Sequence, residues 1–270
     1  MAVLAGDIRV SFGRREILHS VSFAANAGEV TAIVGPNGSG KTTLLKAITG
    51  EVPYSGSVTI NGEDAQTMRP EALATRRAVL PQATTLAFPF TVLEVVRLGL
   101  TAGVSTTTPQ EARDLPHDAL ARVGLAGFEG RFYAELSGGE KQRVQLARVL
   151  IQIWQPVLDG EPRWLFLDEP VSSLDIAHQL MVMGLAADYA KAGGGVVAVM
   201  HDLNLTAMFA DRVTLIEAGN VGASGLPADV LTDTHLSRAY GCALSMNTAP
   251  PAGTPYFLPQ MARLTREAAE

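Results

Sequence analysis

The chain has 270 residues, a formal net charge of −6 and a hydrophobic fraction of 47%. A chain of this length and composition can form a globular protein of one or two domains with a sizeable core. Its acidic balance argues against a nucleic-acid partner, because phosphate binding favours a basic face. Its single cysteine, Cys242, excludes an internal disulfide and suits a reducing compartment.

The N-terminus and the apolar runs bear on membrane association. The first stretch, MAVLAGDIRVSF, has no basic start and is interrupted by Asp7 and Arg9, so it does not resemble a signal peptide. No stretch reaches the roughly 18 apolar residues that a membrane-spanning helix needs. We therefore expect a soluble chain that can associate with a membrane only through a partner.

The N-terminal part of the chain predicts mainly strands. Mixed apolar and polar positions favour strands over Val3–Phe12 and Val21–Ala25, separated by a Gly-Arg-Arg turn. The short apolar run at residues 29–34 predicts a buried strand, and residues 56–62 predict another. Between them, Lys41–Thr49 has the pattern of a helix.

The middle of the chain predicts helices. Apolar residues recur at helical spacing in residues 91–100, and helical stretches are expected at about 118–123 and 137–154. A loop is expected over residues 101–116, where the sequence is rich in threonine and proline.

Two short apolar strands follow this helical block, at residues 164–167 and 196–200. Strands that alternate with helices predict an α/β fold with crossover connections. The residues beyond Gly241 carry four prolines and predict a loose tail or short edge strands.

The sequence GPNGSGKT lies between a predicted strand and a predicted helix, which is the context that a phosphate-binding loop needs. Its glycines allow backbone N–H groups to approach phosphates. We expect Lys41 to reach the β- and γ-phosphates and Thr42 to offer its hydroxyl to Mg²⁺. The residues expected to bind nucleotide here are Gly35, Pro36, Asn37, Gly38, Ser39, Gly40, Lys41, Thr42 and Thr43.

Two acids end the strand in RWLFLDEP. Asp168 is expected at the carboxyl end of the strand, where ligands of open α/β sheets bind, and would hold Mg²⁺ directly or through water. Glu169 would point elsewhere and polarise the attacking water.

Three further residues have both a functional and a structural interpretation. His201 follows a buried strand and could donate to the γ-phosphate, or it could cap the helix that starts at Leu203. Gln82 follows a short strand and could reach the metal and the water, or it could be a solvated loop residue. Phe12 could stack on a nucleotide base or be a core aromatic.

A second glycine loop, LSGGEKQR, starts at Leu136 and leads into the helix predicted over residues 137–154. Ser137 and Glu140 have the spacing of a capping box. Ser137, Gly138 and Gly139 also offer hydrogen-bond donors at the positive end of a helix, which is the pattern of an anion site.

Together with Gln82, His201 and the SSLD that ends at Asp175, these motifs resemble the ATP-binding cassette (ABC) family over essentially residues 1–240. The resemblance implies an ATPase of α/β fold that uses ATP and Mg²⁺. Its parts would be a RecA-like P-loop NTPase core, an N-terminal antiparallel β-subdomain and a helical subdomain inserted at about residues 84–158. Residues 241–270 would form a C-terminal tail.

The resemblance also implies a head-to-tail homodimer, because ABC cassettes pair in this way. The loop at Ser137, Gly138 and Gly139 would cap the γ-phosphate that the second copy holds. Asp175 would cross the same interface beside the catalytic acid of that copy.

A single cassette further implies separate integral-membrane permease subunits, with a periplasmic substrate-binding protein as an indirect partner. The chain would then lie on the cytoplasmic face of the inner membrane. The apolar segment AFPFTVLEVV, residues 87–96, matches the region that receives a permease coupling helix. Its alternative is to pack under the helical subdomain.

Residues 89–100 and 201–213 resemble importers of iron chelates, heme and vitamin B12, and residues 151–164 and 168–179 favour heme. The alternative is a siderophore or vitamin B12 importer. A different class, the soluble non-transport cassettes, usually has two cassettes or a long coiled-coil insertion, and this chain has neither. An exporter component would commonly be fused to membrane spans, and a scaffold with a dead site would lack the intact motifs.

Overall fold

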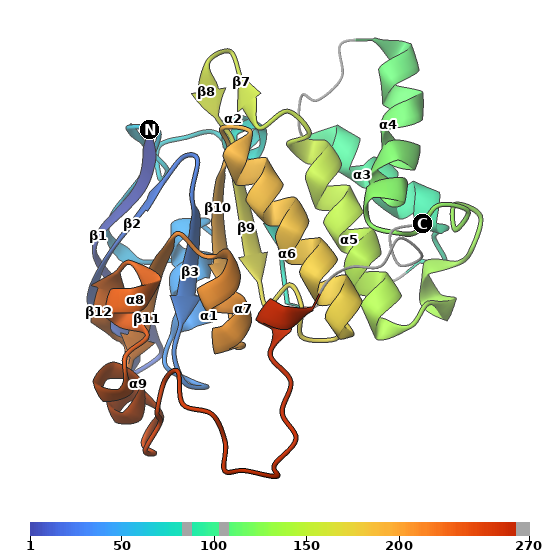
Figure 1. The fold of residues 1–270 in the computed structure, drawn as a ribbon. Coiled ribbons are helices and arrows are strands. Elements are labelled where there is room, and N and C mark those ends of the chain that lie inside the picture. The colour runs from blue at the N-terminus through green and yellow to red at the C-terminus, as the bar shows by residue number, and fades with distance from the viewer. Residues whose placement is uncertain (83–87, 103–107, 263–270) are drawn as a thin grey trace.

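The computed structural model describes residues 1–82, 88–102 and 108–262. The described elements form an antiparallel sheet, a larger and mostly parallel sheet, and a group of helices to one side (Figure 1). This arrangement confirms the α/β fold that the alternation of strands and helices predicts. Within the described ranges, no helix is both long and apolar enough to cross a membrane.

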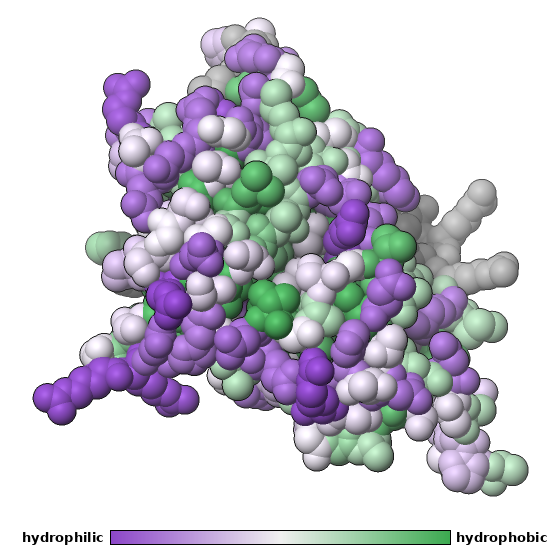
Figure 2. Space-filling view, turned by 90° about the vertical axis from the view of Figure 1, so that its left-hand side faces the viewer, coloured by the Kyte–Doolittle hydropathy of each residue, from purple (hydrophilic) through white to green (hydrophobic). Residues whose placement is uncertain are grey.

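The antiparallel sheet has the strand order β2-β1-β4-β5. Its strands are β1 (Ala2–Phe12), β2 (Arg15–Asn26), β4 (Ser55–Ile60) and β5 (Glu63–Asp64). The second strand is predicted to start at Val21, which is too late. β2 begins at Arg15, directly after a tight turn at Gly13 and Arg14. Figure 2 shows this side of the molecule, on which hydrophilic and hydrophobic residues are interspersed.

The larger sheet has the order β12-β11-β3-β10-β9-β6, and only β12 pairs antiparallel with its neighbour. Its strands are β3 (Val30–Val34), β6 (Arg77–Leu80), β9 (Trp164–Asp168), β10 (Gly195–Val199), β11 (Arg212–Glu217) and β12 (Asn220–Gly225). All residues of β3, β9 and β10 are buried, as expected for parallel strands covered on both faces. The carboxyl ends of β3, β6, β9 and β10 meet at one edge of the sheet. The glycine loop, Gln82, the pair Asp168 and Glu169, and His201 lie at or just after these four ends.

Helices cover both faces of this sheet (Figure 1). One face packs on α1 (Lys41–Ile48), which lies between the two sheets and buries its apolar side in their shared core. The other face packs on α6 (Ile176–Lys191) and α7 (Leu203–Phe209). Three short helices complete this part: α2 (Pro70–Arg76), α8 (Pro227–Val230) and α9 (Asp233–Tyr240).

The helical group consists of α3 (Val92–Ala102), α4 (Pro109–Arg122), the 3-10 turn η1 (Tyr133–Glu135) and α5 (Gly138–Gln152). The loop predicted over residues 101–116 is wrong for its described C-terminal part, because α4 begins at Pro109. The reason is local: Thr108 and Glu111 form a capping box, and proline suits the first position of a helix.

Two smaller features lie in segments that the sequence left without a defined structure. A hairpin of β7 (Val157–Leu158) and β8 (Glu161–Pro162) turns at Asp159 and Gly160, which both have positive φ. In the described part of the tail, residues 241–262, there is no edge strand. This part instead contains the 3-10 turn η2 (Pro259–Met261), which contacts α7.

The contact between α3 and α5 gives a stability prediction. A Cβ atom on Gly99 of α3 would lie 2.1 Å from the backbone oxygen of Arg148 in α5. We expect Gly99→Ala to lower the free energy of unfolding by about 1–3 kcal/mol, because overpacking against backbone forces the helices apart. Gly184→Ala is the control, because a Cβ there meets nothing within 4 Å, and alanine should stabilise α6 by up to about 1 kcal/mol. Denaturant unfolding of both variants checks the sign of each change, and equal effects would contradict the prediction.

Candidate functional site

The glycine loop between β3 and α1 has a backbone that only glycine can adopt. Gly35 and Gly40 have φ angles of +145° and +108°. A Cβ on Gly35 would lie 2.1 Å from the carbonyl oxygen of Ile216, and one on Gly40 would lie 2.7 Å from a methyl group of Leu18. The loop is therefore held tightly from behind. The N–H of Ser39 donates to the carbonyl oxygen of Pro36 at 3.3 Å, and a glycine loop of this kind before a helix suits an anion.

The ammonium group of Lys41 lies across this loop. Its Nζ donates to the carbonyl oxygens of Gly35 and Pro36, at 2.9 Å each, and the residue is only 5% exposed. Burial lowers the pKa of Lys41, while the negative charges of Glu169 and Asp168 oppose that shift. The two bonds to the loop fix the position of the ammonium group.

Thr42 and Asp168 meet beside this lysine. The Thr42 hydroxyl donates to Oδ1 of Asp168 at 2.9 Å, whereas the buried Oδ2 of Asp168 has no hydrogen-bond partner among the described residues. Burial raises the pKa of Asp168, and the bond from Thr42 opposes the rise. A buried carboxylate oxygen without a partner, next to a hydroxyl, fits a hard cation such as Mg²⁺.

The described ranges hold no group of three or more His, Cys, Asp and Glu side chains that could bind a metal by themselves.

Glu169 is the centre of a polar network at the ends of β6, β9 and β10. Its Oε1 lies 2.5 Å from Nε2 of His201, and its Oε2 accepts from Nε2 of Gln82 at 2.9 Å. Its backbone has φ +53°, in the left-handed region, and its carbonyl oxygen accepts from Nε2 of Gln142 at 2.9 Å. The structure therefore brings three predicted residues together and adds Gln142, which comes from α5.

A cavity of about 790 Å³ opens over the glycine loop. Ten of the predicted residues line it: Phe12, Asn37, Gly38, Gly40, Lys41, Thr42, Thr43, Gln82, Glu169 and His201. Four others from the same motifs, Gly35, Pro36, Ser39 and Asp168, are not part of the lining.

Two of the structural interpretations are wrong. Phe12 is 54% exposed at the end of β1, so it is not a core aromatic. His201 does not cap α7, because the cap is Asp202, whose carboxylate accepts from the backbone of Asn204 and Leu205. Gln82 is exposed, but it is bonded to Glu169 rather than only solvated.

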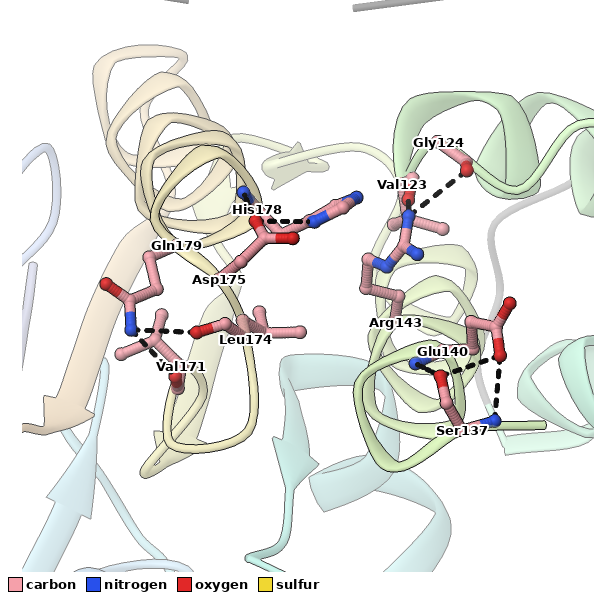
Figure 3. Close-up of polar contacts among 10 residues, drawn as sticks. All are labelled: Val123, Gly124, Ser137, Glu140, Arg143, Val171, Leu174, Asp175, His178 and Gln179. Atoms are coloured by element: carbon pink, nitrogen blue, oxygen red, sulfur yellow. Dashed lines mark hydrogen bonds and ion pairs between the residues drawn. The ribbon is translucent and has the colours of Figure 1, made fainter. Parts of the chain in front are cut away.

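The second glycine loop lies apart from this cavity. The predicted capping box is confirmed: Ser137 Oγ accepts from the backbone of Glu140, whose carboxylate accepts from the backbone N–H of Ser137 (Figure 3). Ser137, Gly138, Gly139 and Asp175 do not line the cavity of their own chain. Ser137 and Gly138 are exposed, so the start of α5 faces solvent.

Sequence reasoning missed four residues at the site: Arg15, Ile17 and Ser172, which line the cavity, and Gln142. The signal for Arg15 was present in the hairpin, because a two-residue turn at Gly13 and Arg14 pairs Phe12 with Arg15. Gln142 has no such local signal, since its contact with Glu169 spans 27 positions of the chain.

The fold and the site define an ATP-binding cassette. The pattern that defines the ABC transporter family matches residues 18–172, and the chain belongs to this family. It is an ATPase whose hydrolysis of ATP is coupled to transport. Among its relatives, the "Hemin import ATP-binding protein HmuV" of Jannaschia sp. (strain CCS1) is 62% identical over 96% of this chain and 94% of its own length. The protein of the same name from Mesorhizobium japonicum is 58% identical over 95% and 97%.

Solved structures support the same fold. A nucleotide-free ATP-binding cassette from an ABC transporter has a TM-score of 0.75 and 23% identity, covering 89% of this chain and 99% of that one. An inward-facing putative metal-chelate type ABC transporter has a TM-score of 0.70 and 24% identity, covering 89% of each chain. These likenesses confirm the expected ABC ATPase architecture.

Proposed function

We propose that this chain is the ATP-hydrolysing subunit of an importer that powers hemin uptake through a separate permease dimer. One observation supports hemin as the substrate. Eight relatives that are 56–62% identical over 93–97% of this chain are all named for hemin import. The segments at residues 151–164 and 168–179 resemble heme importers and are part of the same likeness. Hemin itself would pass through the permease and would not contact this chain.

The site residues have distinct roles in this proposal. Lys41 and the glycine loop bind the phosphates, and Thr42 and Asp168 hold Mg²⁺ with Gln82 beside them. The metal would neutralise phosphate charge in the transition state. Phe12, exposed at the mouth of the cavity beside Arg15, stacks on the nucleotide base.

Glu169 acts as the general base. Oε1 of its carboxylate lies against Nε2 of His201 and Oε2 accepts from Gln82, so the carboxylate is held in one orientation while its remaining lone pairs can accept from water. A γ-phosphate would compete for the imidazole of His201 and release Oε1 of Glu169.

The ATPase would work as a head-to-tail homodimer. Ser137, Gly138 and Gly139 at the start of α5 face solvent or lie near it, and with Asp175 they would complete the ATP site of the second copy. We further infer that the dimer docks on integral-membrane permease subunits at the cytoplasmic face of the inner membrane, with a periplasmic binding protein on the other side. No nucleic acid takes part.

We propose residues 87–96 as the region on which the permease docks. Its first residue, Ala87, lies outside the described residues. The described residue Phe88 is 72% exposed, which suits a surface that a partner covers. We also propose a domain division. The cassette comprises residues 1–240, with the helical subdomain at about residues 84–158 inserted in it, and residues 241–270 form the tail.

Vesicle transport tests the substrate. The complete complex, with its permease and binding protein, is expected to take up hemin when ATP is supplied on the side of this chain. It should take up neither a ferric siderophore nor vitamin B12. A complex that carries Lys41→Ala is the control for ATP dependence. Uptake of vitamin B12 or a siderophore, with none of hemin, would refute the proposal and leave the ATPase assignment intact.

A further inference from the structure

The loop at residues 170–175 connects β9 to α6 and packs against the start of α5. A Cβ on Gly139 would lie 3.1 Å from the carbonyl oxygen of Ser173 and 3.2 Å from a methyl group of Leu174. The two loops that are proposed to face the second copy are therefore in contact within one chain. Figure 3 shows them on neighbouring elements, with α6 on one side and α5 on the other.

The loop is tied to the first turn of α6 by its backbone. Nε2 of Gln179 donates to the carbonyl oxygens of Leu174 and Val171, at 3.0 and 3.4 Å (Figure 3). Asp175 is the N-cap of α6, because its Oδ1 accepts from the backbone N–H of His178 at 3.0 Å. These bonds fix the path of the chain.

The side chain of Asp175 receives a second bond that helix capping does not require. Nδ1 of His178 lies 2.8 Å from the same Oδ1. The bond from the backbone of His178 is the main cause that lowers the pKa of Asp175, and the imidazole adds to it, so this carboxylate is ionised. Both bonds use Oδ1, and the side chain of Asp175 is 68% exposed.

Arg143, the nearby cation on α5, does not take the place of the imidazole as a hydrogen-bond donor to Asp175. Nη1 of Arg143 donates to the carbonyl oxygens of Val123 and Gly124, at 3.0 and 3.1 Å, beyond the end of α4 (Figure 3). Its charge acts on Asp175 only through space, as the weakest of the causes that lower the pKa of that carboxyl. Without the imidazole, the bond from the backbone N–H of His178 would remain, but this exposed carboxylate would be held by one bond instead of two and its orientation would be less restricted.

We propose that His178 is a positioning residue for ATP hydrolysis. Its imidazole holds the Asp175 carboxylate in one orientation and leaves Oδ2 available to the ATP site of the second copy. The proposal rests on the head-to-tail dimer described above. His178 acts only through Asp175 and touches neither nucleotide nor metal.

Two variants of the assembled transporter separate the hydrogen bond from mere packing. His178→Leu removes the donor, and His178→Asn keeps an N–H donor close to the position of Nδ1. We expect His178→Leu to lower kcat for ATP about three- to tenfold, the factor that corresponds to one net hydrogen bond. KM for ATP should change little, because each chain binds phosphate through its own glycine loop. His178→Asn should restore kcat to near the wild-type value.

A double-mutant cycle with Asp175→Ala completes the test. If His178 acts through Asp175, His178→Leu will have no further effect on kcat once Asp175 is alanine. Wild-type kcat in His178→Leu, an equal loss in His178→Asn, or an undiminished effect in the Asp175→Ala background would overturn the proposal. Thermal melting shows whether a variant fails to fold, in which case the His178→Asn variant decides the matter. The readout is ATP hydrolysis, so a failure here is distinct from a failure to transport hemin.

Discussion

Glu169→Gln is expected to lower ATP turnover by about 10²- to 10⁴-fold, the contribution typical of a general base. An amide can keep a hydrogen bond with Gln82 or His201, but it cannot take a proton from water. The change is nearly isosteric, so the left-handed backbone at this residue and its bond from Gln142 should persist. ATP binding should survive because Lys41, Thr42 and Asp168 are untouched.

Steady-state ATPase rates of the assembled complex and direct ATP-binding measurements check this prediction together. The Glu169→Gln dimer should also be stabilised by ATP, since the nucleotide that joins the two copies is no longer consumed. Lys41→Ala is the contrasting variant and should weaken nucleotide binding itself. Near wild-type turnover in Glu169→Gln would remove Glu169 from the role of base.

The site residues that could be predicted from the sequence are those that lie in short contiguous motifs. The glycine loop needs a strand before it and a helix after it, and both β3 and α1 have strong local signals. Asp168, Glu169 and His201 follow buried apolar strands, and parallel strands bring their carboxyl ends to one edge. Local pattern and sheet geometry together were therefore enough to place these side chains.

The rest depends on contacts that no local pattern encodes. Gln142 is half-buried on α5, and its amide reaches the Glu169 carbonyl oxygen only because α5 packs against β6. The start of α4 was missed for a different reason. The spacing of Thr108 and Glu111 is that of a capping box and indicates a helix start. The polar residues around it and Pro116 inside the helix instead favour a loop.

The start of α5 is expected to serve the ATP of the second copy rather than that of its own chain. In one chain, Ser137 and Asp175 do not line the cavity that holds Lys41. Each chain also has one lysine loop and one further donor loop. The test is a dimer of two differently tagged copies within the permease complex. Lys41→Ala is placed in one copy and Ser137→Arg in the other, or both changes are placed in the same copy.

The two arrangements give opposite results. If the loop acts across the dimer, separate lesions fall in the same ATP site and leave the other site whole, whereas lesions in one copy damage both sites. Arg at position 137 should block closure over the phosphate by its bulk and by repulsion from the Lys41 ammonium.

Trapping of nucleotide during turnover is the readout, because net transport can require both sites. Glu135→Arg, which adds the same side chain at an exposed position before the loop, is the control and should trap normally. Residual trapping with the lesions in separate copies, and none with both in one copy, supports the head-to-tail dimer. Residual trapping only with both lesions in one copy would mean that each loop serves its own chain's ATP.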